Sequence, residues 1–107
     1  MKHGPIALLD ESTPVVCIAT ASPVLEKVLS NVEEVRARGA QTIAITTIGG
    51  ERAAEVADET IEVAATDWIL QPIVAILPLQ LLAYGIARAR GLNVDQPRNL
   101  AKTVTVE

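Results

Sequence analysis

Short apolar runs alternate with helical patterns along the whole chain, and this order constrains the fold more than any other feature. The first run, PVVCIAT at 14–20, is rich in β-branched residues and bounded by proline, which predicts a buried strand. QTIAITTI at 41–48 and TIEV at 60–63 predict two further strands. Because a helical pattern follows each strand, the order predicts right-handed crossovers and a parallel sheet.

The helix between the first two strands is closed by favourable residues at both ends. Ser22 suits an N-cap with Pro23 at the first helical position, and Gly39 lies just past the last turn. A short helix is expected at 51–57 and a long apolar helix at 68–87. Five apolar residues recur at helical spacing in the first helix: Leu25, Val28, Leu29, Val32 and Val35.

The segment 68–87 is apolar enough to raise the alternative of a transmembrane span. Glutamines and prolines interrupt it and two arginines follow at once, so a helix buried between other elements explains it better. We therefore expect no membrane partner. The interrupting and following residues are Gln71, Pro72, Pro78, Gln80, Arg88 and Arg90.

Composition narrows the fold class. The chain has 107 residues, enough for one domain (1–107), and is 50% hydrophobic but only 2% aromatic. A core of Val, Ile, Leu and Ala is typical of a parallel sheet covered on both faces. We expect an α/β fold: a partial three-layer α/β/α arrangement with about three parallel strands, helices on both faces and an irregular C-terminal tail at 92–107. Three strands are few for such a sheet, and MKHGP runs directly into IALL, so the chain is expected to be part of a larger domain.

Charge and cysteine content exclude several classes of function. The net charge is −4 and no basic run exceeds two arginines, which argues against a nucleic-acid partner. One cysteine, Cys17, can form no intrachain disulfide and is expected to be a buried, inert thiol in a cytoplasmic protein. A single His with a single Cys cannot build a zinc site, so no metal and no cofactor is expected.

Three places could carry chemistry. His3 could transfer protons, although an exposed residue near a terminus is the simpler interpretation. The loop TTIGG at 46–50 could offer hydroxyls and backbone N–H groups to a phosphate, although a plain turn is favoured. In the tail, a desolvated Lys102 could form a Schiff base with a sugar carbonyl and Arg98 could orient an anion, although solvated surface charge is the default interpretation.

Four stretches resemble one enzyme family in the same order. KHGPIALLDESTPVV, SNVEEVRARGAQ, PLQLLAY and the terminal DQPRNLAKTVTVE are similar to segments of the glutamine:fructose-6-phosphate aminotransferases, the glucosamine-6-phosphate synthases. The likeness covers essentially the whole chain, and the terminal string is highly specific. It identifies the chain as the later part of the second sugar isomerase (SIS) domain of such an enzyme.

The resemblance implies roles for the terminal residues. The lysine of NLAK, here Lys102, forms a Schiff base with open-chain fructose 6-phosphate in the family. The histidine of KHGP, here His3, assists opening of the sugar ring and reaches the site of a neighbouring subunit. Arg98 and Ala101 are implied in substrate binding or in positioning the tail. Fructose 6-phosphate or glucosamine 6-phosphate is the implied partner of the complete enzyme.

The resemblance also indicates which parts of the family's enzymes have no counterpart in this sequence. The family's phosphate loop, its catalytic glutamate and its glutaminase domain have no counterpart in the sequence, so the isolated chain is expected to be nearly inactive. Two alternatives stay open: a stand-alone module that binds a sugar phosphate without turnover, and an interaction piece that pairs with another chain. A homodimer is expected, because three strands and an apolar last helix leave much surface uncovered.

Overall fold

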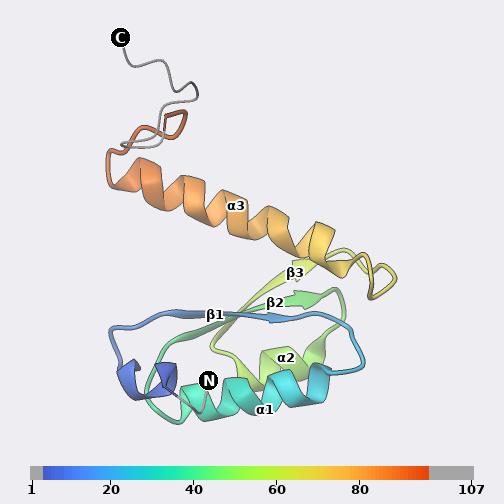
Figure 1. Ribbon diagram of the computed structural model, residues 1–107. Coiled ribbons are helices and arrows are strands. Elements are labelled where there is room, and N and C mark those ends of the chain that lie inside the picture. The colour runs from blue at the N-terminus through green and yellow to red at the C-terminus, as the bar shows by residue number, and fades with distance from the viewer. Residues whose placement is uncertain (1–3, 97–107) are drawn as a thin grey trace. The chain divides into compact units, whose positions relative to one another are not determined.

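The computed structural model describes residues 4–96, and their contacts divide the chain into two compact units, Met1–Ile76 and Leu77–Glu107. A sheet and two helices make up most of the first unit (Figure 1). The elements, in order, are the 3-10 helix η1 (Pro5–Leu8), β1 (Val15–Ala19), α1 (Leu25–Arg36), β2 (Thr42–Thr47), α2 (Glu51–Val56), β3 (Glu59–Val63) and α3 (Gln71–Ala89).

The sheet has three parallel strands in the order β1-β2-β3, so β2 is central. The expected strands are confirmed, each to within a residue or two of its predicted ends. Ile45 of β2 stands in register with Ile18 of β1 and Ile61 of β3, and the three side chains form a row on one face. Ile45 is fully buried, whereas Ile18 is 49% and Ile61 38% exposed.

Helices α1 and α2 pack side by side on the opposite face of the sheet from this isoleucine row (Figure 1). The core beneath them is built from small and β-branched residues, which lets the helices approach the strands closely. Helices were expected on both faces, and α1 and α2 share one. The buried cluster comprises Ala19, Leu29, Val32, Ala44, Ala53 and Ala57.

The two outer strands differ in character. β3 reads ETIEV and carries Glu59 and Glu62, which is how natural proteins protect the edge of a sheet from further pairing. β1 reads VVCIA, has no charge and has the composition of an interior strand. This contrast favours the prediction that the sheet is part of a larger one and extends beyond β1.

Helix α1 begins later than the sequence predicted. Ser22 is not an N-cap: its carbonyl accepts a hydrogen bond from the Leu25 N–H at 3.2 Å, and Val24 occupies the cap position without a side-chain cap. Ser22 and Pro23 therefore belong to a separate turn before the helix. The predicted end is confirmed, because Gly39 has φ +85° just past the last turn.

Helix α3 begins at Gln71, after a turn in which the Asp67 carboxylate accepts a hydrogen bond from the Ile69 N–H at 3.0 Å. Pro78 lies inside the helix and removes one backbone donor. With 19 residues and an apolar composition, α3 is long enough to cross a membrane by length and composition alone. The sequence predicted a helix buried between other elements, but only 6% of its apolar 18-residue window is buried in the described part of the chain.

Candidate functional site

The end of α3 is a closed structure that leads into the tail. Gly91 has φ +67°, and its N–H donates to the Arg88 carbonyl at 3.0 Å. The Leu92 N–H donates to the Ala87 carbonyl at 2.9 Å. These two bonds form a Schellman motif, which needs a residue with positive φ at this position. The helix therefore stops at a defined residue just before the tail at 92–107.

A second turn follows immediately. The Asn93 side-chain oxygen accepts hydrogen bonds from the backbone N–H groups of Asp95, at 2.9 Å, and Gln96, at 3.3 Å. Such a turn is the usual use of asparagine in a loop, because its side chain replaces a backbone acceptor. Two consecutive turns thus fix the direction of the chain as it enters the tail.

The terminal residues named by the resemblance lie outside the described range. His3 precedes Gly4, the first described residue, and Arg98, Ala101 and Lys102 follow Gln96, the last. Their assigned roles remain predictions.

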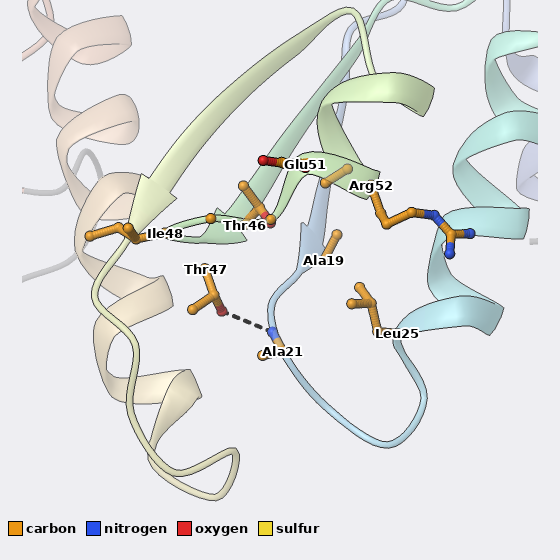
Figure 2. Close-up of a pocket in the computed structure, with 11 residues that line it drawn as sticks. Ala19, Ala21, Leu25, Thr46, Thr47, Ile48, Glu51 and Arg52 are labelled. Atoms are coloured by element: carbon orange, nitrogen blue, oxygen red, sulfur yellow. Dashed lines mark hydrogen bonds between the residues drawn. The ribbon is translucent and has the colours of Figure 1, made fainter.

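The sheet unit contains a pocket of about 340 Å³ at the carboxyl ends of β1 and β2 (Figure 2). Ligands of open α/β sheets bind at this edge. Two loops, after β1 and after β2, and the first turn of α2 surround it. The pocket is lined by Ala19, Ala21, Leu25, Thr46, Thr47, Ile48, Gly49, Gly50, Glu51, Arg52 and Ala53.

The loop after β2 is a turn, as the sequence favoured. The Gly50 N–H donates to the Thr47 carbonyl at 2.8 Å, and Gly49 between them has φ +81°. The N–H groups of Ile48 and Gly49 donate to the Val63 carbonyl, at 2.9 Å, and to a Glu62 carboxylate oxygen, at 3.2 Å. Because these three donors are already used, the loop does not offer the row of free N–H groups that a phosphate requires.

Charges around the pocket do not favour an anion either. The Arg52 guanidinium forms an ion pair with Glu26 of α1 at 2.9 Å. Glu51 adds a carboxylate to the lining. An entering phosphate would meet one negative charge and one arginine that is already paired.

Two threonine hydroxyls remain as polar groups of the pocket. Thr47 Oγ1 accepts a hydrogen bond from the Ala21 N–H at 2.9 Å, which ties the loop after β1 to the end of β2 (Figure 2). Its own proton stays available for donation. Thr46 is 3% exposed and lines the pocket, and its hydroxyl makes no hydrogen bond within the described residues 4–96.

No group of three or more His, Cys, Asp or Glu side chains that could hold a metal occurs in the part of the chain that the structure describes. Cys17 is half-buried, and desolvation raises the pKa of its thiol, which suppresses the reactive thiolate. The sequence prediction of an inert thiol agrees with this environment.

Sequence reasoning singled out the loop at 46–50 for both its hydroxyls and its backbone N–H groups. In the structure the N–H groups of Ile48, Gly49 and Gly50 are already used, and the threonine hydroxyls remain. Two adjacent threonines at the end of a predicted strand were the available signal. Which of them has a partner depends on Ala21, 26 residues away from Thr47, and so could not be predicted from local pattern.

Comparison with known proteins identifies the wider context. The family model described as "SIS domain" matches residues 1–89. The chain is 59% identical over 107 residues to glutamine–fructose-6-phosphate aminotransferase [isomerizing] of Thermus thermophilus, covering 100% of this chain and 18% of the relative. The enzyme of the same name from Thermosynechococcus vestitus is 57% identical, and the match covers 100% of this chain and 17% of that relative. The chain thus spans less than a fifth of the length of these curated relatives.

A solved structure agrees with the sequence matches. The C-terminal domain of glucosamine-fructose-6-phosphate aminotransferase from Francisella tularensis superposes with a TM-score of 0.82 at 36% identity, over 89% of this chain and 27% of that one. The α/β class and the resemblance drawn from the sequence are thereby confirmed. The chain belongs to the SIS domain family, as a segment that matches the isomerase region of the glutamine–fructose-6-phosphate aminotransferases along its whole length.

Proposed function

We propose that these residues form the terminal part of a sugar-phosphate isomerase site, in a protein that makes glucosamine 6-phosphate from fructose 6-phosphate and glutamine. The observation that carries the proposal is the match at 59% identity through the whole chain, tail included, to glutamine–fructose-6-phosphate aminotransferase [isomerizing] of Thermus thermophilus. We place the protein in the cytoplasm, in keeping with its single unpaired cysteine.

Lys102 carries the covalent chemistry in this proposal. Its amine attacks the carbonyl carbon of open-chain fructose 6-phosphate, the carbonyl oxygen leaves as water, and a carbon–nitrogen double bond remains. His3 transfers protons during ring opening, for which imidazole is suited near neutral pH. Arg98 and Ala101 bind substrate or hold the tail in place over it.

The geometry at the base of the tail supports this use of it. A segment that covers a substrate needs a fixed point from which it extends. The Schellman motif at Gly91 and the turn at Asn93 provide one, and Arg98 and Lys102 follow it in the sequence.

The test is to trap the proposed Schiff base. The chain is incubated with fructose 6-phosphate and cyanoborohydride, and the sites of reductive addition are mapped by mass spectrometry. The sequence contains three lysines, Lys2, Lys27 and Lys102, so the exposed Lys27 of α1 measures nonspecific glycation within the same molecule. We expect Lys102 to be labelled well ahead of Lys27. Imine formation does not require turnover, so the missing glutamate does not prevent this result.

A Lys102→Arg variant should lose the preferential label while Lys27 is labelled as before. Glucitol 6-phosphate, which has no carbonyl, should label neither lysine. Equal labelling of Lys27 and Lys102 in the parent chain would contradict the assignment of Lys102.

Self-association is the second part of the proposal. The isoleucine row leaves Ile18 and Ile61 substantially exposed, and β1 has an uncharged free edge. Exposed apolar surface of this kind favours pairing, and a homodimer would cover it. Analytical ultracentrifugation at micromolar concentration should give a dimer, and Ile18→Lys should shift it to monomer. A compact monomer of the parent chain would exclude this part of the proposal while leaving the role of Lys102 open.

A further inference from the structure

We infer that the pocket between the carboxyl ends of β1 and β2 binds a small uncharged molecule carrying hydroxyl or carbonyl oxygens, such as a short polyol. This goes beyond the proposed isomerase function. The pocket is lined entirely by residues between Ala19 and Ala53, so it needs no residue of the tail.

Free hydrogen-bonding groups point to an oxygen-bearing ligand. The Thr46 hydroxyl can both donate and accept, and it has no hydrogen-bond partner among residues 4–96, although the residue is only 3% exposed. The Thr47 oxygen already accepts a hydrogen bond from the Ala21 N–H, and the proton of the same hydroxyl is still available to donate. The Thr46 oxygen is not among the buried unpartnered side-chain atoms of the described residues, so it has access to the open space of the pocket and can bind a ligand oxygen there.

The residues around the pocket disfavour a charged ligand. The Gly49 N–H donates to the Glu62 carboxylate and the Gly50 N–H donates to the Thr47 carbonyl. Arg52 is already paired with Glu26. The Glu51 carboxylate disfavours an anion. A cation would find no set of acidic ligands, since no metal-binding group of side chains occurs in the described part of the chain. A neutral ligand meets neither penalty.

Size and lining complete the description of the ligand. A pocket of about 340 Å³ is at the small end of the range in which proteins bind ligands, roughly 300–1,000 Å³. Ala19, Leu25 and Ala53 present carbon surface, which suits the skeleton of a polyol. Ala19 stands in register with Thr46, and its small side chain leaves space beside the Thr46 hydroxyl.

The absence of a side chain at Gly50 leaves room for the Thr46 hydroxyl. A Cβ at Gly50 would collide with Thr46 Oγ1 and lie 2.9 Å from the Thr47 carbonyl oxygen. Because Gly50 has no Cβ, Thr46 Oγ1 can lie close to the loop, and both residues line the pocket.

The experiment is a titration of the isotope-labelled chain with 1,2-propanediol, followed by amide chemical shifts, with inorganic phosphate as the charged probe. We expect saturable shifts at the amides of Ala19, Ala21, Gly50 and Ala53 with the diol. Phosphate should cause no saturable shift at these amides. Thr46→Val keeps the shape of the side chain but removes the hydroxyl, and should weaken diol binding about fivefold, as for the loss of one neutral hydrogen bond.

Two further variants make the result specific. Thr46→Ser restores the hydroxyl and should restore binding of the diol. Thr60→Val makes the same change at an exposed residue of β3 outside the pocket and should leave binding unaltered. The inference is overturned if the diol gives no saturable shift at the pocket, if phosphate binds there in its place, or if Thr46→Val binds the diol as the parent does.

Discussion

The carboxylate of Asp58 accepts two hydrogen bonds from Thr42, one from its backbone N–H and one from its hydroxyl, each at 2.8 Å. The Asp58 N–H in turn donates to Thr42 Oγ1 at 3.1 Å, and the second carboxylate oxygen lies 2.9 Å from Nε of Arg36. One side chain thereby joins the start of β2, the approach to β3 and the last turn of α1. It fastens the amino ends of the strands, at the opposite edge of the sheet from the pocket.

Replacement of Asp58 by Asn should lower the free energy of unfolding. The amide oxygen can still accept both bonds from Thr42, but the charge is lost and the NH₂ group then faces the Arg36 guanidinium, which it cannot accept from. Urea unfolding at pH 7 measures the change. Glu59→Gln, an exposed neighbour in β3, is the matched control and should unfold close to the parent chain. Equal midpoints for the two variants would contradict the role given to Asp58.

The same contacts predict how stability depends on pH. The hydrogen bonds from the backbone and side chain of Thr42, aided by Arg36, hold the pKa of Asp58 below its ordinary value of 3.8. The unfolded chain therefore binds a proton at higher pH than the folded one does. This contribution to stability is complete above the ordinary pKa and is lost as pH falls through the lowered value. Asp58→Asn should lose less stability than the parent chain between pH 5 and pH 2, which unfolding curves over this range will check.

Local sequence pattern predicted the helices and strands of this fold better than the hydrogen bonds between them. The strand at 42–47 follows from its β-branched composition, and the end of α1 follows from Gly39. The bond between Thr42 and Asp58 spans 16 residues and exists only once β2 and β3 are paired, so no window of sequence contains it. The predicted start of α1 was wrong because Ser22 and Pro23 suit either a helix N-terminus or a turn, and local pattern does not distinguish the two.

For the candidate site, too, some features could be predicted from the sequence and others depend on tertiary contacts. Residue chemistry alone made His3 and Lys102 candidates but favoured exposed surface residues, and the stretches KHGP and NLAK supplied their roles by resemblance. The pocket at Thr46 depends on which hydroxyls and amides find partners after folding. Such partners come from loops after different strands, and their pairing is a property of tertiary structure.

Ile45 is the central residue of the isoleucine row, and its burial predicts a graded response to truncation. It is 1% exposed on the middle strand. Ile45→Val removes one methylene and should cost about 0.5–1.5 kcal/mol, and Ile45→Ala should cost about 2–5 kcal/mol. Urea unfolding will measure both. Ile18→Val, in the same row but 49% exposed, should cost less than Ile45→Val, and the reverse order would show that the row is covered differently.

The ion pair between Arg52 and Glu26 joins α2 to α1 but should contribute little. Both side chains are well exposed, at 61% and 69%, so water and salt screen the attraction. Arg52→Gln is expected to change the free energy of unfolding by less than about 1 kcal/mol. A double-mutant cycle with Glu26→Gln at low and high salt isolates the pair. A coupling that persists unchanged in high salt would mean that the pair is shielded from solvent.

Two neighbouring glycines should respond differently to alanine, because different physical constraints act on them. At Gly50 the backbone conformation, φ −77°, suits any residue, but an added Cβ would collide with Thr46 Oγ1 and crowd the Thr47 carbonyl. At Gly49 nothing lies within 4 Å of an added Cβ, but φ +81° disfavours a side chain. Gly49→Ala should therefore cost about 1–2 kcal/mol from backbone strain alone.

Gly50→Ala should displace Thr46 as well as destabilise the chain, by about 1–3 kcal/mol. The two effects separate in one experiment: urea unfolding gives the stability of each variant, and amide shifts at Ala19 and Ala53 report the pocket. Gly50→Ala should move these shifts, whereas Gly49→Ala should leave them near the parent values. If Gly49→Ala disturbs the pocket as much as Gly50→Ala does, the shape of the pocket depends on the turn and not on the close approach of Gly50 to Thr46.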